Sequence, residues 1–275
     1  MIIAVDTGGT KTLAAASDSE GRFHTRHRFP TPKDDENLYV DLLAQTISEH
    51  FDMKKVRAIS IAVPGFTRGD VFVNCLSPAL DWPDNFELGD KLRAKLGIKV
   101  PIYLENDANL AGLAEAHAFE KLPKSCLYVT VSTGIGLGFS RNGKLVQAMD
   151  YFEGGKMLLE YDGLLRRWED FASGRSIYET YGRYARDIKS KAVWEQIAEK
   201  ISRGLLVLAP TLKPEVIVIG GSIGTYFDKY EVYLNGFLER YIPYIMAETK
   251  VVQAKHPEEA VLYGCKIYAE QKLTK

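Results

Sequence analysis

Short apolar runs alternate with amphipathic stretches along this chain, and their order predicts an α/β protein. The apolar runs predict strands at residues 1–5, 13–16, 56–63, 100–104, 126–132 and 216–219. Alternation over 23–29 predicts one more strand, and a hairpin turned at Asn142-Gly143 is predicted over 137–146. Apolar residues at helical spacing predict helices at 35–51, 86–96, 108–119, 193–208 and 260–271.

The order of these elements predicts two lobes. The first half begins with three consecutive strands, which favour an antiparallel start, and continues through crossovers that add parallel strands. In such sheets, ligands bind at the edge that the carboxyl ends of the parallel strands form. A second round of strands and helices follows, and no flexible linker separates the halves. We therefore expect two α/β lobes that share a hinge and a cleft.

Composition narrows the class of protein but not its chemistry. The chain has 275 residues and a formal net charge of −1, so nothing favours nucleic acid or an anionic membrane as a partner. No apolar stretch approaches the roughly 20 residues of a membrane span, and no secretory pattern begins the chain. The three cysteines, Cys75, Cys126 and Cys265, are far apart. We expect a cytoplasmic globular protein whose thiols are small core residues rather than zinc ligands.

The sequence Asp-Thr-Gly-Gly-Thr-Lys-Thr at 6–12 carries the first candidate chemistry. It joins the first two predicted strands, and Gly8 and Gly9 are expected to supply the positive φ of a two-residue hairpin. A carboxylate beside hydroxyls, glycine amides and a lysine can hold a hydrated metal ion and surround a phosphate. The spacing excludes a P-loop, since a hairpin follows instead of a helix. For this motif alone, a glycine hairpin with a polar tip is the competing interpretation.

Two glycine-rich segments follow later predicted strands. Ser-Thr-Gly-Ile-Gly-Leu-Gly at 132–138 fails as a dinucleotide fingerprint, because its spacing is G-x-G-x-G and a hairpin follows it. Its backbone amides and the Thr133 hydroxyl suit a phosphate. Gly-Gly-Ser-Ile-Gly at 220–224 would let a flat ring approach bare backbone. Each segment alone is a weak signal, but with the Asp6 turn they favour a nucleotide cleft.

Glu105-Asn106-Asp107 lies where a predicted strand meets a predicted helix. The helix N-terminus favours the charged form of Asp107, so this carboxylate can accept a proton from an attacking hydroxyl. Phosphoryl transfer needs little more than a positioned nucleophile, a metal ion and donors around the moving charge. The competing interpretation is that Asp107 only caps the helix. Asn106, which can both donate to and accept from a polyol, favours the catalytic interpretation.

Together these motifs resemble the sugar kinases of the ROK family, within the actin/hexokinase-type ATPase superfamily. The matching segments run in the family order along nearly the whole chain: 6–11, 62–65, Asn74 with Trp82, 104–109, 132–136, 171–174 and 214–221. The resemblance implies two actin-like (ribonuclease H-like) α/β lobes with a nucleotide and sugar cleft between them. Residues 1–107 would form the first lobe, completed by the final helix at 260–275, and residues 108–259 the larger second lobe.

The resemblance also implies roles for individual residues. Asp107 would be the general base for the sugar hydroxyl, usually the one on carbon 6, and Asp6 would position Mg²⁺ through water. The other sugar contacts would come from Gly65, Asn106, Glu153 and Glu169. The ATP phosphates would be surrounded by Gly8, Gly9, Thr10, Lys11, Thr133 and Gly134, and the adenosine would be flanked by Gly220 and Gly221.

The chain departs from the family where those kinases usually carry Glu-x-Gly-His and a cysteine-rich zinc loop. Here the sequence is Glu-Gly-Gly-Lys at 153–156, and the loop cysteines are absent, so we expect no zinc. Leu164, Leu165 and Trp168 are predicted to replace the metal as a small apolar anchor. Lys156 has two open roles: it contacts the substrate, as a donor to a hydroxyl or a partner for a carboxylate or phosphate, or it points to solvent.

The predicted function is therefore an ATP-dependent kinase for a hexose or an amino sugar, a phosphotransferase with an alcohol group as acceptor. The sugar and the use of ATP rather than polyphosphate stay open, and Lys156 keeps an acidic sugar among the alternatives. Dimers are common among members of the family, so a homodimer is an option, although no segment of the sequence identifies an interface. The alternative is a non-catalytic sugar-binding or regulatory member of the family without a DNA-binding domain, because the chain begins directly with the first strand of the core and lacks a basic footprint.

Overall fold

The computed structural model describes residues 1–18, 20–73, 79–256 and 259–274. Contacts divide the chain into two compact units. Unit 1 comprises Met1–Ala114 with Glu259–Lys275, and unit 2 comprises Glu115–Glu258. Asn74 and Cys75, which the sequence singled out, lie outside the described residues. No helix within the described part of the chain is long and apolar enough to cross a membrane.

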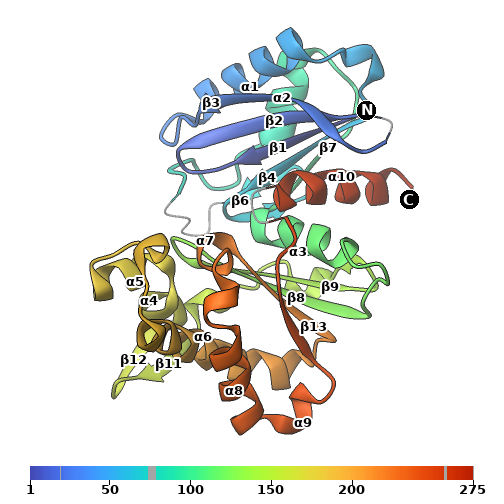
Figure 1. Ribbon diagram of the computed structural model, residues 1–275. Coiled ribbons are helices and arrows are strands. Elements are labelled where there is room, and N and C mark those ends of the chain that lie inside the picture. Colours follow the sequence, from blue (N-terminus) through green and yellow to red (C-terminus); the bar gives the residue numbers. More distant parts are fainter. Residues whose placement is uncertain (19, 74–78, 257–258, 275) are drawn as a thin grey trace. The chain divides into compact units, whose positions relative to one another are not determined.

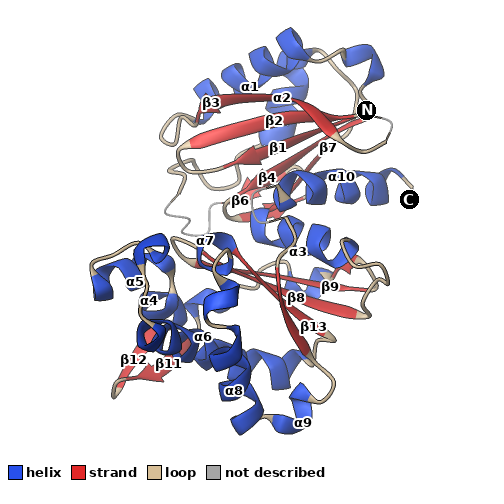
Figure 2. Ribbon diagram, viewed as in Figure 1, coloured by secondary structure: helices blue, strands red, loops and turns tan. Residues whose placement is uncertain are grey.

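Unit 1 combines a mixed sheet with helices on both of its faces (Figures 1 and 2). Its strands are β1 (Ile2–Thr7), β2 (Lys11–Ser17), β3 (Phe23–Pro30), β4 (Ala58–Val63), β5 (Phe66–Arg68), β6 (Val71–Val73) and β7 (Ile102–Asn106). Its helices are α1 (Glu36–His50), η1 (Met53–Lys55), α2 (Leu88–Leu96), α10 (Ala260–Leu273) and the first two turns of α3 (Asp107–His117).

The main sheet of unit 1 has the strand order β3-β2-β1-β4-β7 within the described residues. β1, β2 and β3 are antiparallel, whereas β1, β4 and β7 are parallel. Alternate side chains of β1 divide between two cores: Ile3 and Val5 pack in the cluster that contains α1, and Ala4 packs in the cluster that contains α10. β1 is therefore buried on both faces, which explains its unbroken apolar sequence.

The turn between β1 and β2 differs from the prediction. The hairpin is antiparallel as expected, but three residues, 8–10, separate β1 from β2, and Gly8 N–H donates to the Lys11 carbonyl oxygen at 3.0 Å. Neither Gly8 nor Gly9 has a positive φ, so the predicted two-residue turn with left-handed glycines is wrong. Gly9 is instead closely packed, because a Cβ there would lie 3.1 Å from the carbonyl oxygen of Ala79.

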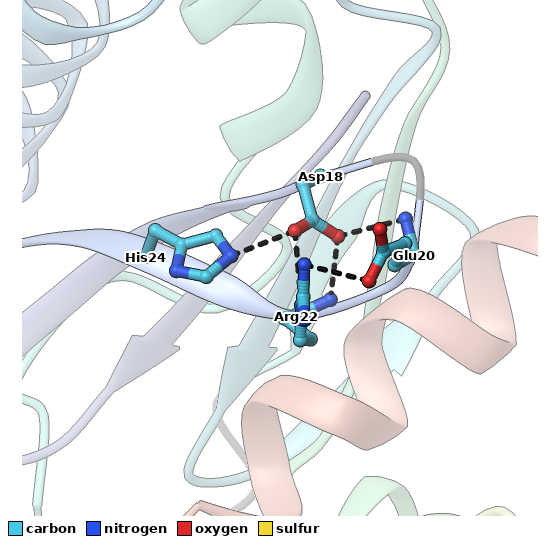
Figure 3. A network of polar contacts seen from close by, with 4 residues as sticks. All are labelled: Asp18, Glu20, Arg22 and His24. Atoms are coloured by element: carbon cyan, nitrogen blue, oxygen red, sulfur yellow. Dashed lines mark hydrogen bonds and ion pairs between the residues drawn. The ribbon is translucent and has the colours of Figure 1, made fainter.

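Asp18 organises the exposed turn between β2 and β3 (Figure 3). Its carboxylate accepts from the backbone N–H groups of Glu20 and Arg22 at 2.8 and 2.9 Å and lies 2.7 Å from Nε2 of His24. The Arg22 side chain pairs with both Asp18 and Glu20. These contacts, led by the Arg22 backbone N–H, lower the pKa of Asp18 to about 2. The network fixes the entry into the edge strand β3.

Unit 2 contains a second mixed sheet and most of the helices of the C-terminal half (Figure 2). Its strands are β8 (Ser125–Val131), β9 (Ile135–Arg141), β10 (Lys144–Leu145), β11 (Leu158–Tyr161), β12 (Leu164–Arg167), β13 (Val216–Gly220) and β14 (Lys250–Gln253). Its helices are η2 (Gln147–Met149), η3 (Gly154–Lys156), α4 (Trp168–Ala172), α5 (Gly174–Tyr181), η4 (Ala185–Asp187), α6 (Lys191–Leu212), α7 (Gly221–Gly224), η5 (Phe227–Lys229), α8 (Glu231–Tyr241) and α9 (Pro243–Met246).

The main sheet of unit 2 repeats the topology of unit 1. Its order in the described chain is β10-β9-β8-β13-β14, with β8, β9 and β10 antiparallel and β8, β13 and β14 parallel. Each unit therefore has three antiparallel strands followed by two that continue in parallel, the first strand lying at the centre. The predicted α/β fold class is confirmed. The two-stranded sheet of β11 and β12, and the helices α7 to α9, were not predicted.

Candidate active site

Three candidate residues of unit 1 come from neighbouring parallel strands. Asp6 lies near the end of β1, Gly65 follows β4, and Asn106 ends β7. β1 pairs with β4, and β4 pairs with β7, so their carboxyl ends share one edge of the sheet. This is the edge at which open α/β sheets bind ligands.

A buried hydroxyl pair and a backbone hydrogen bond brace the Asp6 turn. The Thr7 hydroxyl lies 2.6 Å from the Tyr39 hydroxyl, and the backbone N–H of Thr31 donates to the Thr10 carbonyl oxygen at 3.1 Å. Asp6 itself is half-buried, and its removal from water raises its pKa to about 6. The positive charge of Lys11 lowers the pKa of Asp6, but by less than burial raises it. A cation beside this carboxyl would favour its ionised form, so Asp6 fits the role of a residue that holds hydrated Mg²⁺.

At the β7–α3 junction, Asn106 caps the helix. Its Oδ1 accepts from the backbone N–H groups of Ala108 and Asn109 at 2.9 and 3.1 Å, and its Nδ2 donates to the Gly65 carbonyl oxygen at 3.0 Å. Asp107 is the first helical residue, and its Oδ1 also accepts a hydrogen bond from the backbone N–H of Ala108 at 2.8 Å. The capping role that competed with a catalytic role for Asp107 is thus shared with Asn106, which also accepts from the Asn109 N–H.

A buried polar pair beneath this junction was not assigned a role from the sequence. Glu105 is only 6% exposed, and its Oε1 accepts from the Asn106 backbone N–H at 2.9 Å and from the Asn109 side chain at 3.0 Å. An Asn four residues after a Glu, across a strand-to-helix junction, is the signal that could have indicated it. The pair ties the end of β7 to the first turn of α3 and so fixes the backbone that carries Asp107.

In unit 2, the candidate phosphate loop is held by two glycines from other segments. The loop residues Ser132 to Gly134 connect β8 to β9, and the Gly174 N–H donates to the Ser132 carbonyl oxygen at 2.6 Å. A Cβ on Gly174 would lie 2.7 Å from that same oxygen, and a Cβ on Gly155 would lie 2.0 Å from the carbonyl oxygen of Ile135. Only glycine fits at these two positions, so the loop is closely packed from both sides.

Both candidate sugar carboxylates of unit 2 lie on segments that pack against this loop. Glu153 precedes the 3₁₀ turn η3 and forms an ion pair with Lys156, with 3.2 Å between Oε2 and Nζ. Glu169 lies on α4, and its Oε2 accepts from the backbone N–H of Ile135 at 3.4 Å. Both carboxylates and the lysine are half-buried. Lys156 therefore has a protein partner, a contact that neither predicted role of this residue included.

Gly220 and Gly221 are required by packing within unit 2. A Cβ on Gly220 would lie 2.4 Å from the Tyr128 hydroxyl, and a Cβ on Gly221 would lie 2.6 Å from Oγ1 of Thr130. Gly221 also has a positive φ of 77°. β13 pairs with β8, so these glycines share a sheet edge with the end of β8, which leads into the Thr133 loop. The glycine pair would be needed there even without a ligand.

The predicted apolar anchor at Leu164, Leu165 and Trp168 is wrong in two of its three residues. β11 and β12 form a hairpin on which Leu164 and Leu165 are 55% and 68% exposed. Trp168 is fully buried, and its Nε1 donates to the Lys200 carbonyl oxygen at 3.2 Å. Its ring fills the space beside Gly204, where a Cβ would lie 2.2 Å from it. Trp168 thus belongs to the general core of unit 2, and the hairpin turns its leucines outward.

No group of three or more His, Cys, Asp or Glu side chains that could hold a metal ion occurs among the described residues. Asp6 would therefore supply one carboxylate to a Mg²⁺ ion, and water and phosphate oxygens would have to complete the coordination. Cys126 and Cys265 are buried free thiols in different units, and burial raises the pKa of each to about 12.

A sequence model of the ROK family matches residues 2–272. This chain belongs to the ROK family. The resemblance identified from its motifs is confirmed. N-acetyl-D-glucosamine kinase of Citrobacter koseri is 27% identical across 96% of this chain and 97% of that kinase. Glucokinase of Streptomyces coelicolor is 31% identical over 188 residues, which cover 64% of this chain and 57% of that protein.

The fold is shared with solved ROK structures. A ROK family glucokinase from Streptomyces griseus, solved in complex with glucose and AMPPNP, matches with a TM-score of 0.79 at 24% identity. The match covers 98% of this chain and 99% of that chain. Together with the repeated sheet topology, it identifies the actin-like design of the two units.

Proposed function

We propose that this ROK protein is an ATP-dependent sugar kinase, which transfers the γ-phosphoryl group of ATP to a hydroxyl of a hexose or amino sugar. The observation that carries the proposal is the β7–α3 junction. There a carboxylate, Asp107, begins a helix whose cap is formed by Asn106, and Asn106 is bonded in turn to the Gly65 carbonyl oxygen. The relatives named as an N-acetyl-D-glucosamine kinase and a glucokinase support a hexose or amino sugar as acceptor.

In this mechanism Asp107 is the general base. Its carboxylate accepts the proton of the attacking sugar hydroxyl as the bond to phosphorus forms, and by the family resemblance this hydroxyl is the one on carbon 6. Asn106, Gly65, Glu153 and Glu169 hold other sugar groups, and Lys156 is proposed as a further contact to the same sugar. Because the capping bonds of Asn106 occupy its amide oxygen, we propose that the amide nitrogen is the group it offers to the sugar.

The nucleotide is assigned to the glycine-rich turns. We propose that Gly8, Gly9, Thr10 and Lys11 in unit 1, and Thr133 and Gly134 in unit 2, surround the phosphates. Gly220 and Gly221 would lie beside the adenosine. Mg²⁺ held at Asp6 through water would neutralise charge on the phosphates. The AMPPNP bound in the solved ROK glucokinase supports ATP as the donor.

The decisive experiment measures ADP release from Mg-ATP across a panel of sugars. The panel contains glucose, fructose, mannose, N-acetylglucosamine, N-acetylmannosamine and several acidic sugars. Asp107→Asn should lower sugar-dependent turnover by about 10²-fold or more, the size of a general-base contribution. Asp84→Asn is the matched control, because Asp84 is an exposed residue of unit 1 outside the candidate site.

The outcome separates the two candidate functions. Sugar-dependent ADP release that Asp107→Asn abolishes and Asp84→Asn leaves intact supports the kinase and identifies its substrate class. Sugar binding without turnover, for every sugar in the panel, would overturn the kinase and support a regulatory, sugar-binding role. Metal analysis of the purified protein tests the expectation that no stoichiometric zinc is present.

A further inference from the structure

One carboxylate of unit 2 contacts the candidate phosphate loop directly. Glu169 extends from α4, and its Oε2 lies 3.4 Å from the backbone nitrogen of Ile135, which donates to it. The same oxygen fills the space beside Gly134, since a Cβ on Gly134 would lie 2.8 Å from it. The loop therefore has no side chain at the place where the carboxylate sits. Glycine at position 134 leaves room for this contact, and a larger residue would displace the carboxylate.

The contact has a clear structural consequence for the loop. Within the loop, Ser132 N–H donates to the Gly134 carbonyl oxygen at 2.9 Å, and Gly174 and Gly155 pack against the carbonyl oxygens of Ser132 and Ile135. Glu169 adds an acceptor for the backbone N–H of Ile135. Amide groups that bind phosphate must point their N–H groups in a common direction. A side chain that fixes the Ile135 amide thus also fixes the orientation of the loop.

We infer that Glu169 is a positioning residue for the Ser132–Gly134 loop, which it reaches through the first amide of β9, so that one side chain links the sugar site to the phosphate site. This inference rests on the proposed function, in which Glu169 holds a sugar hydroxyl and Thr133 and Gly134 bind phosphate. A sugar bound at Glu169 restrains its carboxylate, and the carboxylate restrains the loop. Sugar and nucleotide binding are then coupled, and each ligand changes the affinity of the other by the same factor.

Two properties of the Glu169 side chain act on the loop with opposite sign. Its oxygen supports the Ile135 amide, whereas its negative charge repels a phosphate that binds beside Gly134. Glu169→Gln keeps the shape and an acceptor oxygen but removes the charge, and Glu169→Ala removes both. A residue that only held sugar would give the same nucleotide affinity in the two variants when no sugar is present, because both lack the charge.

The test measures the dissociation constant of Mg-AMPPNP by calorimetry in the absence of sugar. We expect Glu169→Ala to bind about 3- to 10-fold more weakly than Glu169→Gln, the size of one hydrogen bond. Glu169→Gln should bind at least as tightly as the unsubstituted protein. Glu179→Ala is the matched control, because Glu179 is an exposed carboxylate of α5 outside the candidate site and should leave nucleotide affinity unchanged. Equal nucleotide affinity in the two Glu169 variants would overturn the inference.

A double-mutant cycle tests whether the contact with Gly134 carries the effect. In Gly134→Ala the added methyl displaces the Glu169 carboxylate, so nucleotide binding should weaken. In the Glu169→Ala background the same change should cost less, because the carboxylate is already gone. Strictly additive effects would mean that Glu169 and the loop act independently, which contradicts the inference.

Hydrogen exchange of the peptide that contains residues 132–136 supplies a readout that needs no ligand. Glu169→Ala should exchange several-fold faster there than Glu169→Gln, because it loses the support of the Ile135 amide. If this difference appears but the protein fails to bind Mg-AMPPNP, the positioning role stands and the proposed function fails. If nucleotide binds but exchange and affinity are the same in both variants, the proposed function stands and the inference fails.

Discussion

The two units hold their candidate site residues by different means. In unit 1, Asn106 and Asp107 are positioned mainly by bonds within the five residues 105–109, with one longer-range bond to Gly65. In unit 2, Glu153 and Glu169 are positioned by segments far apart in the sequence that converge on the loop before β9. The candidate residues of unit 1 depend on side-chain hydrogen bonds to nearby backbone, whereas those of unit 2 depend on the absence of side chains.

This difference predicts how each half responds to substitution. A hydrogen-bonded cap can be replaced by another residue that offers an oxygen at the same place. A glycine whose Cβ position is filled by backbone has no acceptable replacement, because backbone atoms cannot rotate away as a side chain can. Unit 1 should therefore tolerate conservative changes at its candidate residues, whereas unit 2 should tolerate hardly any at its glycines.

Gly155→Ala should have the largest effect. The new Cβ would lie 2.0 Å from the Ile135 carbonyl oxygen, so backbone must move, and we expect a loss of about 3 kcal/mol in the free energy of unfolding. Urea unfolding measures it. Gly236→Ala on α8 is the control, since nothing lies within 4 Å of its Cβ position and alanine there should add up to about 1 kcal/mol. Equal stability of the two variants would contradict the close packing described for unit 2.

Asn106→Ala should have the next largest effect, at the corresponding place in unit 1. Removing the cap of α3 should lower the free energy of unfolding by about 1 to 2 kcal/mol. Asn106→Ser keeps a capping oxygen and should recover most of this loss, although it loses the donor to the Gly65 carbonyl oxygen. If Asn106→Ser and Asn106→Ala have the same free energy of unfolding, the cap assigned to Asn106 is contradicted.

The pH dependence of Mg-ATP use should report on Asp6 in unit 1. Because its pKa is raised to about 6, the carboxylate loses its charge as the pH falls through 6, and kcat/KM for Mg-ATP should fall by up to about tenfold per pH unit. The sign for stability is opposite. A carboxyl with a raised pKa in the folded state favours the fold at low pH, and that contribution disappears as the pH rises through 6.

Activity and melting temperature measured on the same samples between pH 5 and 8 separate the two effects. Loss of activity at pH 5 that follows loss of folded protein would count against the assignment to Asp6. Asp6→Asn should remove the pH-dependent step together with most of the activity, and its melting temperature should lack the contribution that titrates near pH 6.

Lys156→Met should have the smallest effect on stability. The Glu153–Lys156 pair is partly exposed, and such pairs contribute less than about 1 kcal/mol. We expect the KM for the sugar to rise because Glu153 is no longer restrained, while the KM for Mg-ATP stays the same. Lys156→Arg should restore the sugar KM. A change in the nucleotide KM instead would place Lys156 on the phosphate side of the site.

Local sequence signals were sufficient for most of the fold. Asp35 caps α1 with its side chain, Gly97 ends α2 in the left-handed region, and Asn142 and Gly143 both take positive φ in the β9–β10 hairpin. Each of these features depends on residues within a few positions of one another, so a sequence contains the whole cause. The family resemblance rests on the same kind of local motif.

What the chain alone determined is the order of strands and helices, the glycine and acidic residues at the strand ends, and membership of the ROK family. Tertiary structure decided how those residues are used. Gly9 avoids a clash with Ala79 instead of forming a left-handed turn, Leu165 faces solvent instead of anchoring a loop, and Glu169 meets Gly134. Such contacts join segments far apart in the sequence, and their presence depends on whether space is left for a single carbon atom.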